Sequence, residues 1–244
     1  MSETITQTLP LGVSISDGKT RLRVWAPHAK AVAVTGSFND WNEKGISLKP
    51  SEDAGFWQLS TKKISVGDEY QYVITGPNDE RLMRNDPRAR LLTNSSGNTI
   101  VTEDDFDWGD DNYQIPAWNE LVIYEMHIGT FNVVEAGRPG TFLTAIERLD
   151  YLKDLGINLI EVMPVAEFAG DFSWGYNPAY PFSVEEAYGG PTGLKQFVKE
   201  AHARGMGVVM DVVYNHFGPS DMSMWQFDGW HENDKGGIYF YNDW

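Results

Sequence analysis

A short apolar strand followed by polar side chains constrains the fold of this chain more than any other feature. Gly207–Met210 is a compact run rich in β-branched residues, which is typical of a strand buried inside a parallel sheet. Asp211, Asn215 and His216 follow this run directly. In a barrel of parallel strands and surrounding helices, functional groups gather at the carboxyl ends of the strands. The sequence therefore predicts a candidate site just after Met210.

The first 110 residues have a different pattern, made of short alternating runs. Such runs are separated by turn residues and occur at Arg21–Trp25, Ala31–Val34, Gly55–Leu59 and Glu69–Ile74. Short, evenly spaced strands of this kind are typical of a β-sandwich. We therefore predict an immunoglobulin-like β-sandwich as a first domain over residues 1–110.

Residues 111–244 alternate between strand and helix patterns and are predicted to form a second, α/β domain. The predicted strands are Leu121–Met126, Ile157–Val162 and Gly207–Met210, and the predicted helices are Phe142–Leu155 and Pro191–Arg204. Thr141 is a suitable N-cap for the first helix, and Gly156 and Gly205 are suitable residues to end the two helices. This order of elements implies a parallel sheet with right-handed crossovers.

Composition narrows the classes of partner. The chain has 19 basic and 35 acidic residues, giving a formal net charge of −16. This balance argues against nucleic acid or an anionic membrane as a partner, because both require a basic surface. The absence of cysteine excludes disulfides. We find no signal-peptide pattern and no apolar run of about 20 residues, so we expect a cytoplasmic protein.

Several motifs occur together in a fixed order along the chain. They are GSFNDW at residues 36–41, YEMHIGTF at 124–131, WGYNP at 174–178 and DVVYNH at 211–216. In combination they resemble the α-amylase superfamily (glycoside hydrolase family 13) over about residues 11–244. The resemblance implies a glycogen- or starch-binding type of module followed by a (β/α)8 catalytic barrel, of which only strands one to three are included.

The resemblance also implies roles for individual side chains of the barrel. Tyr176 corresponds to an aromatic ring that stacks beneath the sugar at the cleavage point, where a π face can stabilise oxocarbenium charge. His216 corresponds to an imidazole that binds a sugar hydroxyl, and Asp211 to a carboxylate that orients an arginine beside the nucleophile. His127 is expected to hold its loop by hydrogen bonds. Asn215 corresponds to a calcium ligand in many amylases, but the six to eight oxygens that calcium requires cannot be assembled here, so we expect neither metal nor cofactor.

In the module, the resemblance singles out Trp41 and Asn98 as candidate glucan-binding residues. A flat, exposed indole at position 41 could stack on the apolar face of a pyranose. Modules that bind glucan carry a second tryptophan where this chain has Leu82 and Met83. The sequence therefore leaves two alternatives open: a glucan-binding module, or a non-binding brace for the barrel.

The implied substrate is an α-1,4-glucan such as glycogen, starch or a maltooligosaccharide. The motifs are most similar to those of 1,4-α-glucan branching enzymes and trehalose-releasing maltooligosyl hydrolases. Branching, a glycosyl transfer with retention, is the first choice. One alternative is a hydrolase of the amylase or maltooligosyltrehalose trehalohydrolase type, and another is a non-catalytic glucan-binding protein. Residues corresponding to the family's nucleophile and acid/base, which retaining glycosidases need about 5–5.5 Å apart, are not found. The carboxylates after His216 follow no predicted strand that could position them: Asp221, Asp228, Glu232, Asp234 and Asp243.

Two expectations follow from this incomplete set of strands. The 244-residue chain is expected to be an inactive N-terminal portion of a larger enzyme. The third strand is expected to present an unpaired apolar edge, since strands four to eight are not found after His216.

Overall fold

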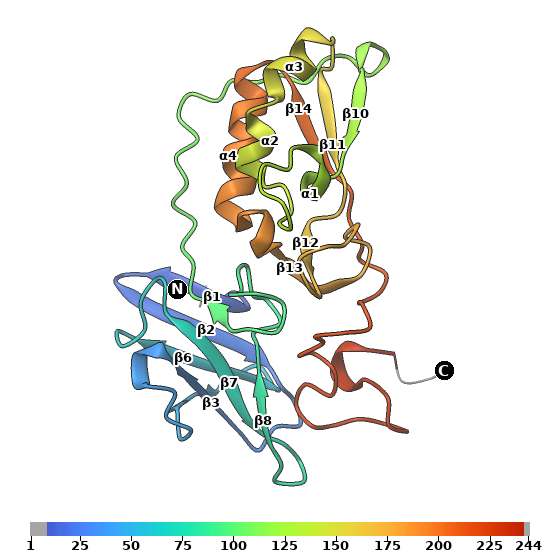
Figure 1. Cartoon of the computed structure of the whole chain (residues 1–244). Helices are drawn as coiled ribbons and strands as arrows, with labels where there is room; N and C mark the ends of the chain where they lie inside the picture. The colour runs from blue at the N-terminus through green and yellow to red at the C-terminus, as the bar shows by residue number, and fades with distance from the viewer. Residues whose placement is uncertain (1–8, 242–244) are drawn as a thin grey trace, which may run out of the picture. The chain divides into compact units, whose positions relative to one another are not determined.

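The structure is a computed structural model that describes residues 9–241 and falls into two compact units. Of the described residues, the first unit comprises 9–89, 98–103 and 223–241, and the second comprises 90–97 and 104–222. Figure 1 shows the ribbon of both units. None of the helices among the described residues is long and apolar enough to cross a membrane.

The first unit contains two antiparallel sheets. One has the order β1-β2-β6-β5, formed by Gly12–Ser16, Lys19–Trp25, Phe56–Thr61 and Lys49–Pro50. The other has the order β4-β3-β7-β8 with β9 paired to β7, formed by Ile46–Ser47, Ala31–Gly36, Glu69–Thr75, Arg81–Arg84 and Thr99–Ile100. The prediction of a β-rich N-terminal domain with antiparallel sheets is confirmed.

The core of this unit lies between the two sheets. Alternate residues of the central strands point inward, as a period of two requires, and form one buried cluster: Leu22 and Val24 from β2, Val32 and Val34 from β3, and Tyr70, Tyr72 and Ile74 from β7. The carboxyl group of Asp86 is buried in this unit and accepts hydrogen bonds from the hydroxyls of Tyr70 at 2.8 Å and Tyr72 at 2.9 Å.

A segment near the end of the described chain completes the sandwich core. Phe227 is fully buried in the same cluster, and Ile238 and Tyr239 of the short 3-10 helix η4 (Gly237–Tyr239) pack against it. The guanidinium of Arg84 donates to the Phe227 carbonyl oxygen at 3.2 Å. The sequence groups this segment with residues 111–244, whereas in the structure residues 223–241 pack with the sandwich, because the apolar side chains of the segment are buried there.

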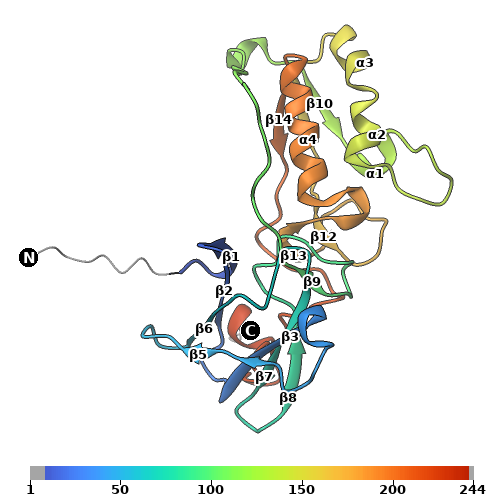
Figure 2. The same ribbon diagram turned by 90° about the vertical axis from the view of Figure 1, so that its left-hand side faces the viewer.

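The second unit is built on a three-stranded parallel sheet of order β10-β11-β14. The strands are Ile123–Met126, Leu159–Val162 and Gly207–Met210, so all three predicted strands form, and the third has the predicted bounds. Helices α2 (Phe142–Ile146), α3 (Leu149–Asp154) and α4 (Gly190–Ala203) pack their buried residues with one face of this sheet (Figure 2). The unit also contains the short helices α1 (Ile128–Phe131), η2 (Trp118–Glu120) and η3 (Glu186–Tyr188).

The prediction of one continuous helix over Phe142–Leu155 is wrong, because the helix breaks between α2 and α3. Thr141 caps α2 as expected, accepting from the Thr144 N–H at 3.1 Å. The Thr144 carbonyl oxygen, however, accepts from the Asn132 side-chain amide at 2.6 Å. The Arg148 N–H, which would bind that carbonyl in a continuous helix, donates instead to Ala145 O at 3.0 Å. A side chain from outside the helix therefore interrupts its hydrogen-bond ladder.

A β-hairpin that the sequence does not predict lies after β11. Its strands are β12 (Ala166–Phe168) and β13 (Pro178–Val184), paired antiparallel with irregular register. Pro178 and Pro181 lie within β13, and proline argues against a strand because it cannot donate to the ladder. The hairpin matters for the site because the WGYNP motif begins in the loop, residues 169–177, that joins its two strands, and ends at Pro178 of β13.

Candidate active-site edge of the parallel sheet

The structure brings together the three side chains predicted to bind substrate. The Tyr176 hydroxyl donates to Asp211 Oδ2 at 2.8 Å, and His216 Nε2 lies 2.7 Å from the Tyr176 carbonyl oxygen. Asp211 directly follows β14, so this cluster stands at the carboxyl end of the sheet, the edge where parallel α/β folds place their sites. Tyr176 is 37 % exposed and is therefore available to a ligand.

Hydrogen-bond partners fix the tautomer of His216. A carbonyl oxygen can only accept, so His216 Nε2 carries the proton that it donates to Tyr176 O. The Asn215 side-chain amide then donates to His216 Nδ1, at 2.9 Å. Asn215 thus orients the imidazole in this arrangement. Among residues 9–241, no group of three or more His, Cys, Asp or Glu side chains is arranged to hold a metal ion.

Close backbone packing holds the loop that carries Tyr176. Gly175 has φ +85°, and a Cβ atom at this position would lie 1.8 Å from the carbonyl oxygen of Pro164, just beyond β11. On the other side, the Gly218 N–H donates to Pro178 O at 2.8 Å. The loop is therefore attached both to the end of β11 and to the segment that follows β14.

His127 braces the same loop, which confirms the prediction that it makes loop-holding hydrogen bonds. Its Nδ1 lies 2.9 Å from Thr130 Oγ1, and its Nε2 lies 2.7 Å from Ser173 O. The Tyr188 hydroxyl also donates to Ser173 O, at 3.3 Å. These contacts connect the end of β10 to the loop, two residues before Gly175.

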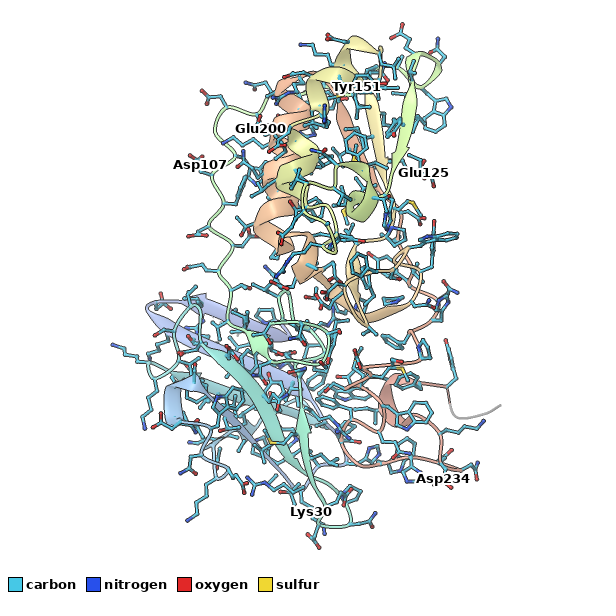
Figure 3. The ribbon with its side chains drawn as sticks, in the orientation of Figure 1. Lys30, Asp107, Glu125, Tyr151, Glu200 and Asp234 are labelled. Carbon is cyan, nitrogen blue, oxygen red and sulfur yellow. The ribbon has the colours of Figure 1, made fainter. Side chains whose placement is uncertain are left out.

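Carboxylates make the site edge electronegative. Glu125 of β10 lies on the side of the sheet away from the helices (Figure 3), and Glu161 of β11 is its register partner. The hydrogen bond to Asp211, partial desolvation, and the charges of Asp211, Glu125 and Glu161 raise the pKa of Tyr176 above its ordinary value. The hydroxyl therefore stays protonated and remains a donor. No sequence motif marks Glu161, although strand pairing places it beside Glu125.

A pocket of about 260 Å³ lies beside the cluster, between the residues that follow β11, the strand β13 and Met210–Tyr214. Flat aromatic side chains are exposed near this edge: Phe172 at 66 %, Trp174 at 74 % and Tyr214 at 76 %. Aromatic rings with one exposed face are suited to stacking on the apolar face of a pyranose. The edge thus combines aromatic faces and carboxylates with the His216 imidazole, whose ring nitrogens contact Tyr176 O and the Asn215 amide.

The candidate residues of the sandwich are less favourably placed than the sequence suggested. Trp41, expected to be exposed, is only partly exposed, has φ +55° and donates its backbone N–H to Gly36 O at 3.0 Å. The Asn98 side-chain amide donates to Glu69 Oε2 at 2.8 Å. Leu82 packs against the sandwich core, while Met83 is 42 % exposed, so neither supplies a second aromatic platform.

Comparison with known proteins agrees with these features. Residues 10–89 match the family "Carbohydrate-binding module 48 (Isoamylase N-terminal domain)". The chain is 35 % identical over 212 residues to malto-oligosyltrehalose trehalohydrolase of Saccharolobus solfataricus, covering 86 % of this chain and 35 % of that protein. It is 34 % identical over 226 residues to the 1,4-alpha-glucan branching enzyme GlgB of Corynebacterium jeikeium, covering 90 % and 31 % respectively. The resemblance to the α-amylase superfamily is confirmed.

A solved structure supports the same relationship. The chain superimposes on pullulanase from Bacillus acidopullulyticus with a TM-score of 0.72 and 31 % identity, covering 87 % of this chain and 31 % of that one. The chain spans about a third of the length of the curated relatives it matches.

Proposed function

We propose that this chain supplies the module and the first three barrel strands of an α-glucan-active enzyme whose reaction is 1,4-α-glucan branching, a retaining glycosyl transfer. The observation that carries the proposal is the meeting of Tyr176, Asp211 and His216 at the carboxyl end of the parallel sheet. In this proposal the Tyr176 ring stacks beneath the sugar, His216 binds a sugar hydroxyl, and Asp211 orients a cationic partner from a further strand. No metal or other cofactor takes part. The domain boundary at residue 110 and a cytoplasmic location remain predictions.

The uncovered face of the sheet supports the partial-barrel part of this proposal. A parallel sheet is ordinarily covered on both faces. Here the helices cover one face, while the other exposes Ile123 at 46 % and Val209 at 39 %, and Val209 is the register partner of Glu161. In a (β/α)8 barrel that second face would be the interior, filled by side chains of the opposing strands.

A hydrolytic reaction is the second candidate. It is favoured by the identity to the trehalohydrolase, which is as high as the identity to the branching enzyme. Both candidate reactions would use the same residues of the described site edge. A glucan-binding protein without catalysis is the third candidate, and it is favoured by the match of residues 10–89 to a carbohydrate-binding module.

The chain alone is expected to leave α-glucans unchanged, because no described carboxylate can be assigned as nucleophile or acid/base. The test incubates the purified chain with amylose and follows reducing ends and the iodine spectrum. Hydrolysis would raise reducing ends, and branching would change the iodine spectrum without raising them. If the purified chain itself turns over amylose, the assignment of the catalytic groups to barrel strands beyond these three is wrong.

Binding tests the site itself. Maltoheptaose titrations should show that Tyr176→Ala weakens affinity about tenfold, equivalent to a loss of about 1.4 kcal/mol, whereas Tyr176→Phe keeps most of it because the ring remains. Tyr151→Ala is the matched control, since Tyr151 lies on α3 and is 63 % exposed (Figure 3). Equal affinities of Tyr176→Ala and the parent chain would contradict the role of Tyr176. Submicromolar binding lost on Trp41→Ala would favour the binding-protein candidate.

A further inference from the structure

Two glutamates are buried at the base of the hairpin that carries the Tyr176 loop. Glu167 lies in β12 and is 1 % exposed, and Glu185 follows β13 directly and is 2 % exposed. Ionised carboxylates are costly to bury, and buried charges are ordinarily paired with a cation. The fold of a short hairpin does not by itself call for two such groups, so their presence requires an explanation.

The two carboxyl groups bind the backbone across the hairpin in a reciprocal manner. Glu167 Oε2 accepts from the Glu186 N–H at 3.0 Å, just beyond β13. Glu185 Oε2 accepts from the Phe168 N–H at 3.2 Å, at the end of β12, and its Oε1 accepts from the Ala187 N–H at 3.2 Å. Each strand end is thus held by a side chain from the other, and we call this arrangement the carboxyl clasp.

The surroundings of the clasp favour protonation. The groups that act on it are the carboxylates of Asp171 and Glu186, and the Tyr188 hydroxyl lies within range of Glu185; no cation is among the described groups acting on either carboxyl. Burial, followed by repulsion from Glu185, raises the pKa of Glu167 to about 8. Burial is also the main cause that raises the pKa of Glu185, to about 7, against the opposing effect of its two backbone hydrogen bonds.

We propose that Glu167 and Glu185 are positioning residues whose clasp holds the Tyr176 loop against Asp211 and His216, and that the clasp opens when both carboxyls are ionised. The effect of this positioning on glucan binding rests on the proposed function, whereas the existence of the clasp does not depend on that function. The loop leaves β12 directly after Phe168, whose N–H the clasp holds, and enters β13 at Pro178. Repulsion between two buried anions would separate the strand ends and release the loop.

The pH dependence follows from linkage. Both carboxyls have folded-state pKa values above their ordinary value of 4.5, so the folded chain holds more protons than the unfolded chain between about pH 4.5 and 8. The stability that the clasp contributes is therefore greatest at acidic pH and is lost as the pH rises through about 7 to 8. The stability contributed by an ordinary ion-paired glutamate changes with pH in the opposite direction.

Amide hydrogen exchange tests the clasp without any ligand. In the 244-residue chain, protection factors of peptides spanning residues 166–169 and 185–188 should fall about tenfold or more between pH 6 and pH 9, since one pKa unit corresponds to a factor of ten. In Glu167→Gln/Glu185→Gln the fall should be less than about twofold, because glutamine keeps an acceptor oxygen without titrating. Should the double variant misfold, Glu185→Gln alone should reduce the fall.

Asp171→Asn is the matched control, because Asp171 is an exposed acid of the same loop and its removal should leave most of the pH effect. A fall of the same size in the double glutamine variant, or no fall in the parent chain, would overturn the clasp. Maltoheptaose binding at pH 9 should weaken in the parent chain but not in the double variant. If no variant binds glucan at any pH, the proposed function fails while the exchange result still decides the clasp.

Discussion

Replacing Phe227 with alanine should destabilise the sandwich unit by about 3–5 kcal/mol, the usual cost of removing a buried phenylalanine. Phe227 is 0 % exposed and packs edge-on against Tyr239, with ring centroids 5.4 Å apart. It belongs to the same buried cluster as Leu22 and Tyr72 of the two sheets. The core of the sandwich is therefore completed by a residue that follows β14 in sequence.

Urea unfolding of the sandwich unit would measure this loss, with Trp57 fluorescence as one local probe. Tyr241→Ala is the control from the same segment, because Tyr241 is 84 % exposed and its removal should change the free energy of unfolding by less than about 0.5 kcal/mol. A loss below about 1 kcal/mol for Phe227→Ala would show that the segment is not part of the sandwich core. A fragment ending at residue 110 lacks Phe227, so we expect it to be less stable than the sandwich in the whole chain.

Local sequence patterns predicted the elements whose structure depends mainly on neighbouring residues. Alternation located β2, β3, β6 and β7, and the GVVM run located β14. Thr141 caps its helix, and Gly156 and Gly205 have the positive φ values of helix-ending residues. Motif resemblance also singled out Tyr176, Asp211 and His216, and in the structure Tyr176 contacts both of the other two, 35 and 40 residues away in sequence.

The features that sequence patterns missed all depend on contacts between distant residues. Asn132 interrupts the predicted helix because its side-chain amide donates a hydrogen bond to the Thr144 carbonyl oxygen. Phe227 looks like a loop residue until its burial in the sandwich is known. Glu167 and Glu185 look like ordinary surface acids because a hairpin with two prolines in one strand does not predict their burial. In each case the deciding partner lies outside any local window.

Replacing Gly175 with alanine should disrupt the site edge more than any change to a side chain that is proposed to contact substrate. A non-glycine residue at φ +85° costs about 1–2 kcal/mol. In addition, the new Cβ would lie 1.8 Å from Pro164 O, an overlap with backbone that only movement of the loop can relieve. We expect a total loss of about 3 kcal/mol in the second unit, with disruption of the Tyr176–Asp211 and His216–Tyr176 hydrogen bonds.

Gly170→Ala separates the two contributions, because Gly170 lies in the same loop at φ +76° but a Cβ added there would meet no atom within 4 Å. This variant should show only the conformational cost, about 1 kcal/mol, and should retain the glucan affinity that depends on Tyr176. Chemical unfolding and maltoheptaose titration of both variants give the comparison. Equal losses would mean that the contact with Pro164 does not hold the loop. A larger loss for Gly175→Ala, with loss of Tyr176-dependent binding, would show that close packing on the end of β11 places the ring in the site.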